Sequence, residues 1–187
     1  MDRVSFFTAL AIVAVVWAYV PYIRSILSGT SRPTLSTWLS WLIVDAVILA
    51  GMIAKDSIVR QMYVYFAGTG LIVILCGVKK VTIEWKKLDS FCFGLVILAL
   101  VGWYFSGNAN VAITISVVAN IVGSIPMLIN LWKDPHNEPL RGWLYGLLAA
   151  TLGVLAIPSM TIAYALTPIA FFFIQSGVII LILRRQI

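Results

Sequence analysis

The sequence predicts an all-α integral membrane protein with seven transmembrane helices, and three observations lead to this prediction. Hydrophobic residues make up 61% of the 187 residues and charged residues only 11%, whereas soluble domains carry about 25% charged residues. The apolar residues gather in seven runs, each close to the roughly 20 residues that cross the hydrocarbon layer. Backbone groups in hydrocarbon must bond within their own segment, so these runs are expected to be helices rather than strands.

Each expected helix ends where charged residues, or a group of Gly, Pro, Asn and Ser, interrupt the apolar run. The seven spans are expected at residues 4–27, 35–54, 58–78, 90–105, 111–132, 140–157 and 161–183. The first run could be mistaken for a signal peptide. Asp2 and Arg3 flank it and no small-residue cleavage site precedes Pro21, so it is expected to be a retained helix.

The basic residues predict the orientation of the chain. With the N-terminus outside, the inner segments hold ten of the 13 Lys and Arg residues and the outer segments hold three. Cytoplasmic loops carry such an excess, so an N-outside, C-inside arrangement is expected. The same rule accounts for the net charge of +6, and nucleic-acid binding is not expected. The short loops favour a bacterial inner membrane, with the lipid bilayer as a partner.

Two parts of the chain resemble each other. Pro126 follows Pro21, and Trp143 follows Trp38, at the same shift of 105 residues. Four expected crossings separate the two starts, so the halves face the same way, as parallel repeats do in some transporters. The expected units are a first three-helix repeat at 1–78, a basic linker with a linker helix at 79–106, and a second repeat at 107–187. Chance recurrence in an apolar chain is the alternative.

This three-plus-one-plus-three plan, with a proline near the end of the first helix of each triplet, resembles the PQ-loop and SWEET superfamily. The resemblance implies two triple-helix bundles around a central route, and facilitated or proton-coupled movement of small solutes by rocking. Tyr22 and Met127 follow the two prolines, so the Pro-Gln pair is absent. Ala67 and Ile169 stand where SWEET carriers have sugar-binding asparagines.

Asp45 is the most informative candidate residue, because no other formal charge lies near the centre of an expected span. A central Asp costs about 2.5–3.5 kcal/mol on insertion scales, and such residues usually face the interior or a water-filled cavity. Two interpretations stay open. Asp45 could hold a proton or a cationic solute, or it could tie its helix to a neighbouring hydroxyl.

Further route candidates lie on two other expected helices. Ser116 and Asn120 share one face of the fifth helix with Gly123 and Ser124. This face could line a route, or it could allow two helices to pack closely. On the third helix, Tyr65 and Thr69 could offer hydroxyls to a pocket; Gln175 on the seventh is a weaker candidate that is expected to pack tightly.

Prolines and tryptophans are candidates of another kind. Pro21 and Pro126 cannot donate a backbone hydrogen bond and clash with the carbonyl four residues back. They are expected to act as hinges near an inner gate, with static kinks as the alternative. Trp38, Trp41 and Trp143 are expected to anchor helix ends at the membrane interface, with a stacking platform for a solute as the alternative.

The residues give no sign of an enzyme, a metal site or a cofactor. His136 is the only histidine and lies far along the chain from Cys76 and Cys92, so no metal or nucleophile constellation is expected. Two functions stay open. One is a transporter or facilitator of a small polar solute by alternating access, with Asp45 as the carrier of a coupling proton. The other is a non-transporting receptor, sensor or assembly subunit on the same fold. A homo-oligomer is compatible with either.

Overall fold

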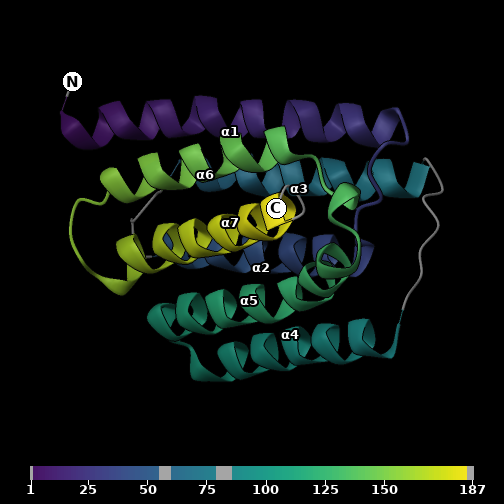
Figure 1. Cartoon of the computed structure of the whole chain (residues 1–187). Helices are drawn as coiled ribbons and strands as arrows, with labels where there is room; N and C mark the ends of the chain where they lie inside the picture. The colour runs from purple at the N-terminus through teal and green to yellow at the C-terminus, as the bar shows by residue number, and fades with distance from the viewer. Residues whose placement is uncertain (1, 55–59, 79–85, 185–187) are drawn as a thin grey trace.

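The computed structural model describes residues 2–54, 60–78 and 86–184, and these residues form helices and no strands. The long helices lie side by side (Figure 1). They are α1 (Arg3–Leu27), α2 (Leu35–Ala54), α3 (Gln61–Val78), α4 (Lys87–Ser106), α5 (Ala109–Lys133), α6 (Leu140–Leu155) and α7 (Thr167–Leu183). A short 3-10 helix, η1 (Pro135–Asn137), precedes α6, and a π-helical turn, η2 (Ile162–Leu166), leads into α7.

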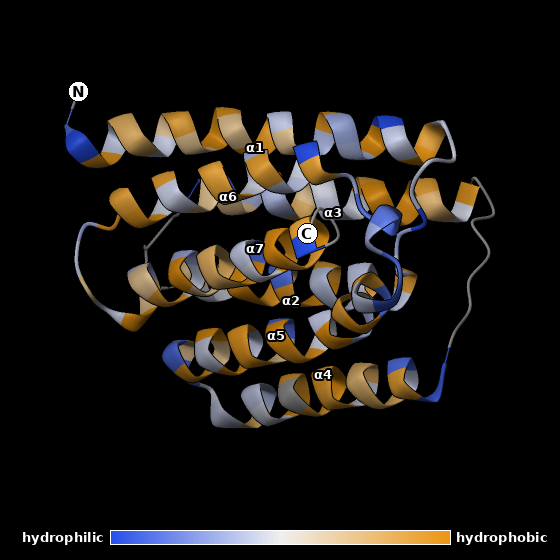
Figure 2. Ribbon diagram, in the orientation of Figure 1, coloured by the Kyte–Doolittle hydropathy of each residue, from blue (hydrophilic) through white to orange (hydrophobic). Residues whose placement is uncertain are grey.

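The membrane class expected from the sequence is confirmed. Within the described residues, six helical segments are long and apolar enough to cross a membrane, and hydrophobic residues run along them (Figure 2). The helix α6 is also apolar but has only 16 residues, so it rises about 24 Å, less than the roughly 30 Å of hydrocarbon. It ends at Leu155, two residues before the expected end. Lys55, Lys79, Lys80 and Arg185, which enter the orientation argument, lie outside the described residues.

The start of α4 differs from the prediction for a physical reason. The helix begins at Lys87 rather than at residue 90, because the Asp89 carboxylate accepts a hydrogen bond of 2.8 Å from the backbone N–H of Lys86. This capping interaction satisfies a donor that the first turn would leave free. The Ser36 hydroxyl also donates to Asp89 and so ties α4 to α2. At the other end, Gly107 takes a left-handed φ of 60°, which ends the helix.

The entry to α7 also departs from a regular helix. Residues 162–166 form the π-helical turn, and Pro168 lies in the first turn of α7. Proline cannot donate to the carbonyl four residues back, which belongs to Tyr164. The wider turn accommodates this missing bond.

The helix contacts follow a regular pattern. In each half of the chain, the third helix packs against the other two: α3 contacts α1 and α2, and α7 contacts α5 and α6. Between the halves, α1 packs on α6 and α2 packs on α5, while α4 packs on α5 and α2. Glycines allow the helices to approach closely at the α2–α5 and α1–α6 interfaces. A Cβ at Gly123 would lie 2.8 Å from that of Ser40, and one at Gly142 would lie 3.1 Å from the Ala18 carbonyl oxygen.

The connections among the described residues lie at two opposite ends of the molecule (Figure 1). The α1–α2 and α5–α6 connections meet at one end, where the N–H of Arg32 donates to the carbonyl of Asn137 at 3.3 Å. The N-terminus and the α6–α7 connection meet at the other end, where the Arg3 guanidinium donates to the carbonyl of Ile157 at 3.0 Å. Consequently α1 and α5 run in the same direction, and α2 and α6 run in the opposite one.

Candidate functional site

A cavity of about 80 Å³ lies between the two halves of the chain. Its lining residues come from α1, α2, α3, α5, α6 and α7, and none comes from α4. One water molecule takes about 30 Å³ in the liquid, so the cavity has room for a few waters or a small solute. Four of the five route residues expected from the sequence line it: Asp45, Tyr65, Thr69 and Asn120.

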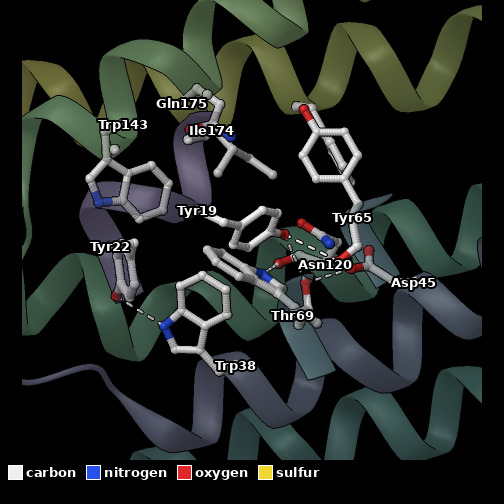
Figure 3. A pocket seen from close by; sticks show the side chains of 15 residues that line it. Tyr19, Tyr22, Trp38, Asp45, Tyr65, Thr69, Asn120, Trp143, Ile174 and Gln175 are labelled. Carbon is white, nitrogen blue, oxygen red and sulfur yellow. Dashed lines mark hydrogen bonds between the residues drawn. The ribbon is translucent and has the colours of Figure 1, made fainter. Parts of the chain in front are cut away.

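Asp45 is buried in α2 with half of its carboxyl group unpaired. Its side chain is 3% exposed, and its Oδ2 accepts a hydrogen bond of 3.0 Å from the Thr69 hydroxyl (Figure 3). Its Oδ1 has no hydrogen-bond partner among the described residues. The tie to a neighbouring hydroxyl therefore exists, but it satisfies only one oxygen. A buried, unsatisfied polar atom costs about 1–3 kcal/mol, and more when it is charged, so this unpaired oxygen, on a residue that lines the cavity, is costly to retain.

Tyr19 positions the hydroxyl that binds Asp45. The Tyr19 hydroxyl donates to the carbonyl of Tyr65 at 3.1 Å and lies 3.3 Å from the Thr69 hydroxyl. Its ring fits against α3 only because residue 68 is glycine, since a Cβ there would overlap the ring. The chain Tyr19–Thr69–Asp45 thus links α1, α3 and α2 along one wall of the cavity.

Four aromatic side chains line one end of the cavity, and we call them the aromatic cluster. Its members are Tyr22, Trp38, Trp41 and Trp143. Successive ring centroids are 4.9 Å apart for Tyr22–Trp38, 5.2 Å for Trp38–Trp41, 6.2 Å for Trp41–Trp143 and 6.3 Å for Tyr22–Trp143, which closes the circle. These spacings are typical of favourable aromatic pairs.

The burial of these tryptophans does not fit the expected role of interface anchors. Trp38, Trp41 and Trp143 are only 4%, 8% and 5% exposed, whereas an anchor presents its ring to the lipid headgroups. Their indole N–H groups also bind inside the protein. Trp38 donates to the Tyr22 hydroxyl at 3.1 Å, and Trp41 donates to the carbonyl of Asn120 and to the Ser124 hydroxyl, each at 3.2 Å.

Glu138 lies behind the aromatic cluster, in the connection between α5 and α6. It is 5% exposed, its Oε2 accepts a hydrogen bond of 3.0 Å from the Trp143 indole N–H, and it is also hydrogen-bonded to the Tyr22 hydroxyl. Burial raises the pKa of Glu138 to about 7, although both hydrogen bonds act in the opposite direction. Because Trp38 binds Tyr22, this network joins α1, α2 and α6 at the end where the two proline-containing connections meet.

The polar face of α5 divides between two roles. Asn120 lines the cavity. The Ser124 hydroxyl accepts a hydrogen bond from the Trp41 indole N–H, and Gly123 packs against Ser40. Ser116 is fully buried but does not line the cavity. Gly123 and Ser124 therefore lie at a close helix contact and Asn120 at the cavity, and a role of this face in lining a route stays a prediction.

The two prolines lie inside helices that continue past them. Pro21 is within α1 and directly precedes Tyr22 of the aromatic cluster, and Pro126 is within α5. A hinge role for either stays a prediction.

Three residues that form hydrogen bonds at the site were not predicted: Tyr19, Tyr22 and Glu138. Tyr19 and Tyr22 are three residues apart, a spacing that places both on one face of a helix, so the sequence did contain a signal for them. Glu138 lies in a polar loop, and nothing in its local sequence indicates burial.

The described residues contain no group of three or more His, Cys, Asp and Glu side chains that could hold a metal ion. Cys76 and Cys92 are buried free thiols on α3 and α4. Comparison of the chain with protein-family models, with curated proteins and with solved structures gave no match.

Proposed function

We propose that this protein is a membrane carrier that moves a small solute by alternating access, on a plan like that of the PQ-loop and SWEET superfamily. The observation that carries the proposal is the cavity between the two halves, which contains a buried carboxyl group with one free oxygen. A membrane protein retains a buried carboxyl at a considerable cost, and such residues commonly mark solute or ion pathways.

The pattern of helix contacts supports the repeat that this plan requires. If α1, α2 and α3 are exchanged with α5, α6 and α7, the contacts α1–α3 and α2–α3 become α5–α7 and α6–α7. The contact α1–α6 likewise becomes α5–α2. The pattern therefore maps onto itself, as expected for two parallel three-helix units joined by α4 as the linker.

Contacts that a carrier could open and close in turn lie on two opposite sides of the cavity. At one end lies the aromatic cluster with Glu138 behind it. On the opposite side, Tyr65 and Phe171 pack edge to face with ring centroids 5.0 Å apart. In this proposal Pro21, beside Tyr22, and Pro126 in α5 act as the hinges that move these contacts.

We place the N-terminus outside and the C-terminus inside, in a bacterial inner membrane, from the distribution of Lys and Arg. In this orientation the aromatic cluster forms the inner gate.

The alternative, a receptor, sensor or assembly subunit without a route, predicts that no cavity reaches Asp45. The cavity beside Asp45 favours the carrier.

Uptake into proteoliposomes tests the carrier. The panel should contain sugars, amino acids, amines and vitamins, each with and without a pH gradient. At least one solute should accumulate inside, and Asp45→Asn should reduce its uptake about tenfold, since a hydrogen bond to a charged group contributes about 1.5–3 kcal/mol. Asp134→Asn, which changes an exposed carboxyl far from the cavity, is the control. The proposal would be contradicted if no solute of the panel were taken up, or if Asp45→Asn took up the solute as fast as the wild type.

A further inference from the structure

We propose that the cavity binds a small organic cation, an amine or a quaternary ammonium ion, between Asp45 and the surrounding aromatic side chains. This inference rests on the proposed carrier function for the movement of the cation, and on the cavity alone for its binding.

The charges around the cavity select a cation. Asp45 presents an unpaired carboxyl oxygen, and no Lys or Arg of the described residues lines the cavity. An anion, or the carboxylate of a zwitterion, would therefore enter a buried site without a basic partner, which is strongly unfavourable. An ammonium group would pair its positive charge with the Asp45 carboxylate, and it would bring no negative charge that needs a basic partner.

The other buried acidic groups do not compete for this role. Among the described residues, the buried charged side chains are Asp45, Asp89 and Glu138, all acidic. Asp89 is satisfied by Ser36 and by the N–H of Lys86, and Glu138 by Trp143 and Tyr22. Of these three residues, as far as the structure describes their partners, only Asp45 has a buried carboxyl oxygen without a hydrogen bond. Asp45 also lines the cavity.

The aromatic side chains select an organic cation over a hydrated ion. The aromatic cluster lines the cavity together with Tyr19, Tyr65 and Phe171. The indole N–H groups of Trp38 and Trp41 are already bound within the protein, so these residues offer a solute their ring surfaces. A cation within about 6 Å of such a ring gains roughly 0.5–1 kcal/mol, or about 2 kcal/mol and more once both are desolvated.

The same walls disfavour a sugar or another polyol. Each hydroxyl of such a solute needs a partner once it leaves water. The hydroxyls of Tyr19, Tyr22 and Thr69 on the lining are already hydrogen-bonded within the protein. Besides Asp45, the lining offers such a solute the unpaired Tyr65 hydroxyl and the amides of Asn120 and Gln175. Figure 3 shows Tyr22, Trp38 and Trp143 on one side of the pocket, Asp45 and Tyr65 on the other, and Tyr19 between them.

Equilibrium binding tests the inference independently of transport. Calorimetric titration of the full chain in detergent would compare choline with 3,3-dimethylbutan-1-ol, an uncharged solute of the same shape. Choline should bind saturably and the alcohol at least about tenfold more weakly, a difference of about 1.4 kcal/mol. Tetramethylammonium and methylammonium would extend the comparison to smaller cations.

Two pairs of variants assign the binding to the proposed groups. Asp45→Asn, which keeps the side-chain shape, should lower choline affinity about tenfold and leave the alcohol unchanged, whereas Asp134→Asn should change neither. Trp38→Leu should weaken choline binding, whereas Trp103→Leu, on α4 and off the cavity lining, should not. The melting temperature of each variant would show that it is folded.

The inference is overturned if choline and the alcohol bind equally, or if none of the three cations binds. Uptake of an uncharged solute without cation binding would overturn the inference while supporting the carrier. Saturable cation binding that Asp45→Asn weakens, without uptake of any solute, would support the inference and contradict the carrier.

Discussion

Asp45 and Glu138 are two buried carboxyl groups with different hydrogen bonding. Glu138 accepts hydrogen bonds from two aromatic side chains that belong to helices of different halves. Asp45, which lines the cavity, accepts one from Thr69 and has a second carboxyl oxygen without a partner among the described residues. The first arrangement ties α1 to α6, and the second leaves a carboxyl oxygen for the proposed solute.

The free energy of unfolding of the protein should depend on pH through Glu138. Its pKa rises from 4.5 to about 7 on folding, so the folded state holds the proton more strongly than the unfolded state does. Stability should therefore be greatest below about pH 4.5 and fall as the pH rises through 7, by at most about 3 kcal/mol.

Thermal unfolding between pH 5 and pH 8 measures this dependence, with Glu138→Gln as the test variant. The variant cannot titrate at this position, so its melting temperature should vary less with pH than that of the wild type. Asp134→Asn, an exposed carboxyl in the same connection, should keep the wild-type profile. A wild-type slope retained by Glu138→Gln would assign the pH dependence to other groups.

The helix α2 shows which part of the site could be predicted from the sequence. Trp38, Trp41 and Asp45 follow one another at spacings of three and four, which places them on one helix face. Because a central Asp faces the interior, this spacing already indicates that both tryptophans are buried. The interface interpretation relied on their position near a helix end, which is a weaker signal than the shared face.

The helix α3 depends on one glycine for its contact with α1. A Cβ at position 68 would overlap the Tyr19 ring, whereas one at position 77 would meet no atom within 4 Å. Gly68→Ala should therefore displace Tyr19 from Thr69 and lower the free energy of unfolding by about 1–3 kcal/mol. Gly77→Ala, on the same helix, should be neutral or add up to about 1 kcal/mol.

Unfolding of both variants in the same detergent, with solute uptake alongside, measures the difference. Loss of uptake in Gly68→Ala with retention in Gly77→Ala would support the role of Tyr19 in shaping the cavity. Equal behaviour of the two variants would show that the Tyr19 contact has no such role.

At the scale of the whole molecule, local patterns predicted the membrane class and most helix bounds. Hydrophobic length fixes a membrane helix with little help from distant residues. The site depends instead on contacts between helices far apart in the chain. The bond from Trp41 to Asn120 and the network around Glu138 each join segments of different halves, and no local pattern reports such pairs. The exception is Asp45, because the free-energy cost of placing a carboxyl group in hydrocarbon makes such a residue a candidate from the sequence alone.

Two-sided access to the cavity tests the carrier most directly. In a chain with Cys76→Ala and Cys92→Ala, the variant Asn120→Cys places a thiol at the cavity, and Val118→Cys places one on the exposed, apolar side of the same helix. A membrane-impermeant maleimide would be applied to either face of the membrane in turn. The account predicts labelling of Asn120→Cys from both faces and of Val118→Cys from neither, and labelling of Asn120→Cys from one face only, or from neither, would contradict it.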